Sequence, residues 1–416
     1  MKKNSFLPIV VLILTILLSV LLCLSIFSLF KKPVSDDVTF PDDGKIENNT
    51  GSDITQTVKR EPRKISFLAA GDSIIHSSVY EDAKLLAKGT GETYNFCPMF
   101  DNVKDIISSA DIAFVNQETP CAGEKYAASG YPMFNTPDEI ADALIYAGFD
   151  IVNISNNHML DKGTAGLERC VEFWNGIDDI CLVGCYDKSL DCDNIKYFVK
   201  DTVKIAFLSY TYGTNGLKMS DSSDVEFYYC DKNDVDRQTK LARKTADIVI
   251  VSMHWGVEDR FTPTDEQKEY ADILTKNNVD VVIGTHPHVI ETIEWKQNTD
   301  GHKTLVAYSL GNMLSTMLYS RNMLGGFLTF DILENENEPG TYYVDNAGFI
   351  PTVTHYSTSR RALKIYKLSD YTPELEKVHG SHANEKNKNI DYLYSLVRNY
   401  IPKEFISEDS LDFIYE

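Results

Sequence analysis

The sequence predicts an α/β domain that is preceded by an N-terminal transmembrane helix. Two observations support this prediction: an uncharged apolar run near the start of the chain and, from Lys64 onward, short apolar runs that alternate with helical segments. Continuous apolar strands are typical of sheets that are covered on both faces. With 416 residues, of which 43% are hydrophobic, the chain is long enough to bury a large core.

Residues 1–32 are the predicted membrane anchor. The 25 residues from Phe6 to Phe30 include no charged residue, and lysines flank them on both sides. As a helix they would extend roughly 37 Å, enough to cross a hydrocarbon core of about 30 Å. A cleaved signal peptide is the alternative, but its apolar region is usually about 7 to 15 residues long and ends at small residues. We expect a retained single-pass anchor in the cell membrane, with the C-terminal domain extracellular.

Residues 33–62 are the predicted polar linker. They are rich in Asp, Asn, Thr and Lys and show almost no apolar periodicity.

The whole chain carries a formal net charge of −21. This charge argues against binding nucleic acid or anionic lipid over a broad face, so an anionic substrate needs a local attraction such as a metal ion.

Seven cysteines lie beyond the anchor, and their spacing lacks the paired CxxC form of a structural zinc site. An odd number leaves at least one thiol unpaired. The pattern favours scattered packing thiols and leaves open one disulfide among the cysteines from Cys170 to Cys192.

Apolar runs and helical segments alternate through the predicted domain, residues 63–368. The expected strands are KISFLAAGD, DIAFVNQE, FDIVNISNNH, VKIAFLSY, DIVIVSMHWG, VDVVIGTHPH and KTLVAYSLGN. The expected helices are PDEIADALIYAG, GLERCVEFWNG, DVDRQTKLARKTA and TDEQKEYADILTKN. Strand-like runs follow in GGFLTFDI and GTYYVDNAGFIPTVTHY, and residues 369–416 form a polar C-terminal tail that packs on the domain or hangs loose.

Polar residues whose side chains can bind a metal follow six of the expected strands. They are Asp72 and His76, Asn116 and Glu118, Asn157 and His158, His254, His286 and His288, and Asn312. Taken singly, each is explained as well by a turn, a helix cap or a surface hydrogen bond. Together they predict a metal site, because ligands in α/β sheets bind at the carboxyl ends of the strands.

The types of the candidate ligands narrow the choice of metal. Imidazole, carboxylate and amide oxygen without thiolate suit Mn, Zn or Fe. The candidates outnumber the four positions of one tetrahedral ion, so we expect two divalent ions that share a carboxylate. Such pairs stabilise the attacking and leaving oxygens in phosphoester hydrolysis.

These motifs carry a resemblance to a known family. The ordered set AAGDSIIH, VNQE, SNNHMLDKG, MHWG, GTHPH and YSLGN resembles the capsule-synthesis protein CapA family of bacterial poly-γ-glutamate systems over residues 64–355. That family is similar to the calcineurin-like metallophosphoesterases. The resemblance implies a metallophosphoesterase-like four-layer α/β/β/α sandwich.

The resemblance also implies roles for individual residues. Asp72 and His288 would bind the first metal, Glu118 would bridge, and Asn157, His254 and His286 would bind the second. His158 would be the general acid, oriented by Asp161, and Asn312 would lie at the rim or brace the backbone. His76 is a further candidate ligand, although it follows Asp72 by four positions where the phosphoesterases have two, and Glu118 replaces their bridging Asp.

Three functions fit these residues. The first is a metal-dependent hydrolase of a phosphoester, ester or amide in the envelope, with His158 protonating the leaving oxygen. The second, which follows the family role, is a membrane subunit for synthesis or export of poly-γ-glutamate or another envelope polymer. It would work with other capsule-synthesis subunits, and its site would bind polymer ends or be vestigial. The third is a purely structural surface protein, which predicts no metal dependence.

The segment Thr285 to His288 sharpens the metal hypothesis. Pro287 disfavours the α region for His286, so we expect an extended backbone there. Side chains one residue apart on such a backbone point to opposite sides. Either each imidazole reaches its own ion, or a local turn brings His286 to one ion while His288 serves the other.

Overall fold

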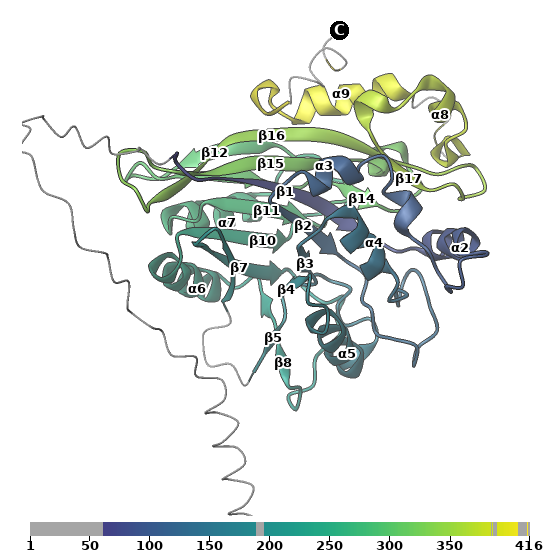
Figure 1. Ribbon diagram of the computed structural model, residues 1–416, viewed down its shortest axis with the longest axis horizontal. Helices are drawn as coiled ribbons and strands as arrows, with labels where there is room; N and C mark the ends of the chain where they lie inside the picture. The colour runs from purple at the N-terminus through teal and green to yellow at the C-terminus, as the bar shows by residue number, and fades with distance from the viewer. Residues whose placement is uncertain (1–60, 189–194, 384, 386–388, 407–413, 415–416) are drawn as a thin grey trace, which may run out of the picture. The chain divides into compact units, whose positions relative to one another are not determined.

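The fold is described from a computed structural model, which describes residues 61–188, 195–383, 385, 389–406 and 414 (Figure 1). The predicted anchor, all but the last two linker residues, Cys192 and parts of the C-terminal tail lie outside these residues. None of the helices within the described ranges combines the length and the apolar character that a membrane span needs. The anchor therefore stays a prediction.

Two large sheets form the centre of the described domain (Figure 1). The first has the order β17–β16–β15–β1–β2–β3–β4, with β14 pairing with β1. Strands β1 to β4 and β14 are parallel, whereas β15, β16 and β17 join antiparallel. Its strands are β1 (Lys64–Ser73), β2 (Ile112–Gln117), β3 (Ile151–Asn153), β4 (Cys181–Val183), β14 (Asn312–Leu314), β15 (Leu324–Glu334), β16 (Tyr342–His355) and β17 (Lys364–Lys367).

The second sheet has the order β12–β13–β11–β10–β7–β6, with β9 pairing with β7. Its centre is parallel, and the strands β12 and β6 at its two edges are antiparallel. Its strands are β6 (Lys196–Lys200), β7 (Val203–Thr211), β9 (Tyr228–Tyr229), β10 (Ile248–His254), β11 (Val281–Thr285), β12 (Ile293–Gln297) and β13 (Lys303–Ala307). A separate short pair joins β5 (Tyr186–Asp187) to β8 (Val225–Glu226).

Helices cover the outer faces of both sheets. On the first sheet they are α2 (Ser77–Leu86), α3 (Lys104–Ser108), α4 (Ile140–Ala147) and α5 (Gly163–Asn175); on the second they are α6 (Lys232–Thr245) and α7 (Asp265–Lys276). The remaining elements are α8 (Pro373–Lys377), α9 (Ile390–Tyr400) and the 3-10 turns Cys97–Met99, Ser320–Met323, Leu368–Asp370, Gly380–Ala383 and Lys403–Phe405.

Three apolar cores separate these layers. The alternation within β1 illustrates the arrangement: Phe67 and Ala69 pack between the two sheets, whereas Leu68 and Ala70 pack under the helices of the first sheet. Both faces of the strand are buried, which explains its continuous apolar sequence. The layers therefore run helix, sheet, sheet, helix, and the predicted α/β/β/α sandwich is confirmed.

The predicted elements appear where their patterns lie. Each of the seven expected strands of the alternating region contains an observed strand, and the four expected helices correspond to α4, α5, α6 and α7. Their ends follow the sequence signals: Gly148 ends α4 in the left-handed conformation, and Thr264 and Gln267 form a capping box at the start of α7.

The tail beyond residue 368 includes α9, whose apolar side chains Leu393, Leu396 and Val397 are buried in the core that also fills the space between the sheets. α9 lies along β16 in Figure 1. The boundary that we drew at residue 368 stays a prediction.

The described cysteines are free thiols: Cys97, Cys121, Cys170, Cys181, Cys185 and Cys230. Burial raises the pKa of Cys185 and Cys230 and raises that of Cys170 to about 12. The packing role is therefore the one observed, and a disulfide among Cys170, Cys181 and Cys185 is excluded.

Candidate metal centre

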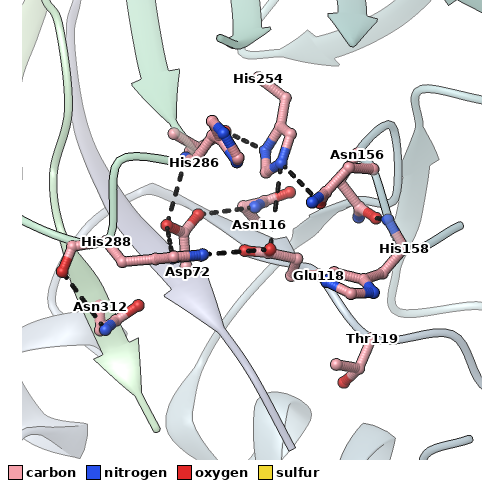
Figure 2. A network of polar contacts seen from close by, with 12 residues as sticks. Asp72, Asn116, Glu118, Thr119, Asn156, His158, His254, His286, His288 and Asn312 are labelled. Carbon is pink, nitrogen blue, oxygen red and sulfur yellow. Dashed lines mark hydrogen bonds and ion pairs between the residues drawn. The ribbon is translucent and has the colours of Figure 1, made fainter. Parts of the chain in front are cut away.

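The carboxyl ends of the parallel strands of both sheets meet at one buried cluster. Asp72 lies near the end of β1, Glu118 directly follows β2, His254 ends β10 and His286 directly follows β11. Figure 2 shows their side chains converging from the two sheets. Residues more than 200 positions apart in sequence are thus in contact, because the carboxyl ends of the parallel strands in both sheets lie next to each other.

A break in strand pairing aims Asp72 into this cluster. The register of β1 shifts between Ala70 and Asp72 against β2, and again after Asp72 against β14. Gly71 permits the close approach, since a Cβ there would lie 2.0 Å from the carbonyl oxygen of Gly311. A bulge at a strand end re-aims a side chain, and here that side chain is the Asp72 carboxylate.

A chain of buried side-chain hydrogen bonds holds the Asp72 carboxylate in place. Asn116 Nδ2 donates to Asp72 Oδ1 at 2.8 Å, and Asn153 Nδ2 donates to Asn116 Oδ1 at 2.9 Å. Ser209 Oγ on β7 of the second sheet donates to Asn153 Oδ1 at 2.6 Å. The chain therefore ties the first sheet to the second directly behind the cluster.

The segment from His286 to His288 is a turn with left-handed backbone at both histidines. The φ angles are +99° at His286 and +56° at His288, a region that costs roughly 1–3 kcal/mol for a non-glycine residue. The His286 N–H donates to Asp72 Oδ2 at 3.2 Å and the Asp259 N–H donates to the Pro287 carbonyl at 2.9 Å, which fix the turn. The prediction of an extended backbone is therefore wrong, and the turn brings the two imidazole centroids within 5.7 Å of each other.

Two groups of potential ligands share Glu118. One consists of Asp72, Glu118 and His288, and the other of Glu118, His254 and His286; within each, the ligand atoms lie within 4.8 Å of one another. Glu118 Oε1 lies 3.6 Å from His288 Nε2 and 4.0 Å from His254 Nε2. A carboxylate between two sets of imidazole and carboxylate ligands is the arrangement that suits a pair of divalent ions.

The residues fit bound cations because polar atoms of the cluster lack other partners. Both carboxylate oxygens of Glu118 and Nδ1 of His286 are buried, and none has a hydrogen-bond partner in the described part of the chain. An unsatisfied buried polar group costs roughly 1–3 kcal/mol and more when it is charged. A cation between these atoms would satisfy them.

Two of the three histidines, His254 and His286, are in the neutral form that binds metals, whereas His288 is protonated beside Asp72 and Glu118. Burial lowers the pKa of His254 and His286 well below the usual value, which keeps both in the neutral form that binds metals. Burial also raises the pKa of Glu118, with Asp72 adding to the effect and His288 opposing it. At His288 burial alone would lower the pKa, but the Glu118 charge and the hydrogen bond to Asp72 raise it to about 10.

Asn157 lies against the second group. Its Oδ1 is 3.0 Å from His254 Nε2, while His254 Nδ1 is 2.9 Å from Thr285 Oγ1. If Thr285 accepts the Nδ1 proton, the Nε2 lone pair faces the amide oxygen of Asn157. Two acceptors that face each other at this distance are a suitable pair of ligands for a cation.

His158 and Asp161 form a pair at the edge of the cluster. His158 Nδ1 lies 2.9 Å from Asp161 Oδ2, which also accepts the Phe134 N–H at 2.7 Å. Asn156 Oδ1 accepts the backbone N–H of His158 at 3.0 Å. His158 lies beside Glu118 in Figure 2.

The structure does not bring His76 into either ligand group. Its Nδ1 accepts the Thr316 N–H at 3.4 Å, and burial lowers its pKa to about 3.

Asn312 braces the backbone: its Nδ2 donates to the carbonyl oxygens of His288 at 3.4 Å and Asn322 at 2.9 Å. Metal binding at the other six predicted ligands, and the catalytic roles of His158 and Asp161, stay predictions.

Sequence reasoning missed several residues of the site. Asn153, Ser209, Thr285 and Asn156 support the ligands through hydrogen bonds, and Glu258 forms a third potential ligand group with His286 and His288. A polar residue inside an apolar strand, as Asn153 is in IVNIS, is a signal that could have identified one of them. Glu258 is exposed on a loop, where a carboxylate carries no such signal.

Comparison with known proteins agrees with the resemblance of the motifs. The chain is 24% identical over 285 residues to the capsule biosynthesis protein CapA of Bacillus anthracis, and 28% identical over 240 residues to the PGA biosynthesis protein CapA of Bacillus subtilis (strain 168). These alignments cover 66% and 57% of this chain, and 66% and 62% of the relatives' own lengths.

Among solved structures, the chain is similar to the calcineurin-like phosphoesterase YfkN from Bacillus subtilis, with 12% identity and a TM-score of 0.37 over 86% of this chain and 100% of that one. The sequence model of one family, described as Bacterial capsule synthesis protein PGA_cap, matches residues 66–317, which is more than half of the chain. The chain therefore belongs to the bacterial capsule synthesis protein family PGA_cap.

Proposed function

We propose that this protein is a membrane-anchored, extracellular capsule-synthesis protein with a metal-dependent hydrolase site that acts on a phosphoester, ester or amide of an envelope polymer. The observation that carries the proposal is the position of Glu118. Its two buried oxygens have no hydrogen-bond partner in the described chain, and it is shared by two groups of potential ligands. The uncharged run from Phe6 to Phe30 supports the anchor.

The polymer is proposed to be poly-γ-glutamate or a related anionic envelope polymer, and the protein to act beside other membrane subunits of its synthesis or export. Membership of the capsule synthesis family supports this proposal. The two Bacillus relatives, one of which is named for PGA biosynthesis, support it as well.

The residues that would hold two divalent cations are Asp72, Glu118 and His288 on one side and Glu118, Asn157, His254 and His286 on the other. Bound cations of this kind supply Lewis-acid activation of water and of the group under attack. The chain's own contribution is to bury the ligands and to hold them with the hydrogen bonds behind Asp72 and His254.

His158 supplies a proton to the leaving atom in this proposal. Asp161 Oδ2 accepts Nδ1–H of His158. This hydrogen bond fixes the ring, so that Nε2 points away from Asp161. No hydrogen-bond partner of Nε2 is found among the described residues. A positioned imidazole of this kind contributes about 10²–10⁴-fold to the rate of proton transfer.

The test measures metal content and hydrolysis in the purified full-length protein. We expect bound Mn, Zn or Fe, and cleavage of either an aryl phosphodiester or a γ-glutamyl oligomer. The variant His158→Asn should keep its metal and lose about 10²-fold or more in kcat.

Absence of bound metal from the unsubstituted protein would overturn the proposal. Bound metal without cleavage in either assay would instead favour the non-catalytic function, a subunit that binds polymer ends. The variant His302→Asn is a matched control, because this half-buried histidine lies against Val279 and Asp280 at the opposite end of β11.

A further inference from the structure

A cavity of about 440 Å³ lies at the start of α2. Its wall includes His76, Ser77 and Glu81 from α2 and the residue before it, Tyr131 from the loop that follows β2, and Arg360 and Arg361 from the loop between β16 and β17. His76 is the predicted ligand that lies outside both ligand groups. Its position on this wall gives it a different surrounding from the other histidines of the strand ends.

The two arginines of the cavity lack acidic partners in the described part of the chain. The ion pairs found there involve other arginines, such as Arg169 with Asp138 and Arg243 with Asp280. Arg361 Nη1 donates only to the backbone carbonyl of Arg360, at 3.0 Å. Two adjacent guanidinium groups without an ion-pair partner in the described residues attract an anion from outside.

The loop that carries these arginines is held by hydrogen bonds within the loop and to α2. The Arg360 N–H donates to the Ser357 carbonyl at 2.7 Å, and the Ser357 N–H donates to the Arg361 carbonyl at 2.8 Å. Buried Asp82 on α2 accepts the N–H groups of Ala362 at 3.2 Å and Leu363 at 2.9 Å. The arginine backbone is therefore fixed to α2, so less ordering is needed when a ligand binds.

The cavity adjoins the proposed proton donor. The rings of His76 and His158 both pack edge-on against Phe134, with centroid distances of 5.6 Å and 4.8 Å. Tyr131, on the cavity wall, lies 6.4 Å from the same Phe134 ring. One aromatic side chain, Phe134, thus lies between the cavity wall and the proposed proton donor His158.

We propose that Arg360 and Arg361 bind an anionic oxygen group of the substrate, a carboxylate or a phosphate, that lies next to the leaving group. This inference rests on the proposed function, since it places a second substrate contact beside His158. Planar guanidinium groups bind both anions through paired hydrogen bonds. Glu81, on the same wall, repels a second negative charge, so the cavity suits one anionic group rather than a stretch of polyanion.

The experiment compares two double variants of the full-length protein that remove equal charge. Arg360→Gln with Arg361→Gln empties the cavity wall of positive charge, whereas Arg237→Gln with Lys240→Gln removes two exposed cations from α6. The probes are a γ-glutamyl trimer, the same trimer with its carboxylates amidated, and inorganic phosphate. Binding is measured by calorimetry, and metal content is measured in each variant.

We expect the unsubstituted protein and the α6 variant to bind the acidic trimer equally and the arginine variant to bind it at least about tenfold more weakly, the size of one lost charge-assisted contact. The amidated trimer should not distinguish the three proteins. Weaker binding of phosphate as well would identify any anionic oxygen group as the ligand; a loss confined to the trimer would identify a carboxylate.

Equal affinity of both double variants for the acidic probes, or no binding by the unsubstituted protein, would overturn the inference. The proposed function fails in a different way, through absence of metal or of cleavage, and a selective loss of binding in the arginine variant would support the anion site even then. Where cleavage occurs, the arginine variant should raise KM for the acidic trimer about tenfold and leave kcat and metal content unchanged.

Discussion

Two clusters of buried histidines in this molecule differ in how their polar atoms are satisfied. At the candidate metal centre, the carboxylate of Glu118 and Nδ1 of His286 are buried without a hydrogen-bond partner in the described residues. In the C-terminal cluster, formed by His355, Tyr371 and His379, His355 Nδ1 lies 2.8 Å from the Tyr371 hydroxyl. His379 Nε2 lies 3.0 Å from the Thr354 carbonyl, and its Nδ1 accepts the Ser381 N–H at 3.0 Å.

The difference separates a site from a structural contact. Neutral His379 uses both ring nitrogens for hydrogen bonds within the chain, so it needs no ligand. The candidate metal centre instead contains unsatisfied carboxylate and imidazole atoms and two histidines with left-handed backbone. Burial alone therefore does not mark a functional histidine, whereas buried atoms without partners in the described residues, such as those of Glu118 and His286, indicate a ligand.

The largest expected effect distinguishes the two clusters by substitution. His288→Ala should remove the cation held with Asp72 and Glu118 and lower hydrolysis by roughly a thousandfold, about 4 kcal/mol of transition-state stabilisation. His379→Ala should keep both metal and activity and lower the free energy of unfolding by about 2–3 kcal/mol, because it leaves the Thr354 carbonyl without its partner.

Metal analysis, steady-state kinetics and denaturant unfolding of the two variants test this contrast. Loss of metal from the His379 variant, or full metal content in the His288 variant, would contradict it.

Metal removal should affect the unfolding of the unsubstituted protein and of His379→Ala alike. A cation at about 100 times its Kd stabilises the folded state by about 2.7 kcal/mol, so a chelator should lower the free energy of unfolding by about that amount in both. In His288→Ala the chelator should have a smaller effect, since Asp72 and Glu118 lack the third ligand of their group and only the group of Glu118, His254 and His286 is complete. Thermal unfolding with and without chelator measures this, and an equal chelator effect in all three proteins would show that the cation binds elsewhere.

Most of the layered fold was predictable from sequence because both sheets are covered on both faces. Strands such as those of Ile248–His254 and Val281–Thr285 are continuous apolar runs, and the helices between them carry clear caps. The antiparallel additions, β6 and β12, were missed because their exposed or half-buried residues lack that apolar signal.

The site was predictable in its residue types and not in its backbone. The order of the strand ends identified Asp72, Glu118, Asn157, His254 and the histidine pair. The turn at His286 and His288 was not predictable, because the Asp72 carboxylate and the Asp259 N–H that stabilise it come from distant parts of the sequence. His76 was predicted as a ligand because it follows the first strand. It is instead the residue that precedes α2, and it lines a neighbouring cavity.

The smallest expected effect is a pH dependence that belongs to the C-terminal cluster. Burial, with smaller contributions from the neighbouring His355 and His382, lowers the pKa of His379 to about 3, although the hydrogen bond to the Thr354 carbonyl opposes the shift. Because the folded pKa lies below that of the unfolded chain, about 6.5, the unfolded chain takes up a proton first as the pH falls. Stability should therefore decrease from pH 6.5 downward, and at pH 4.5 His379 alone should account for about 2.5 kcal/mol.

The measurement is the free energy of unfolding between pH 7.5 and 4.5, with chelator present, for the unsubstituted protein and for His379→Gln. The other histidines whose pKa is lowered, among them His76, His254, His286 and His355, remain in both proteins, so the difference between the two curves isolates His379. Glutamine can still donate to the Thr354 carbonyl and accept from the Ser381 N–H, but it takes up no proton. The two curves should converge as the pH falls. Parallel curves would mean that His379 takes up a proton as readily in the folded chain as in the unfolded chain. The hydrogen bonds of the C-terminal cluster would then not hold His379 in its neutral form, and the contrast with the candidate metal centre would fail.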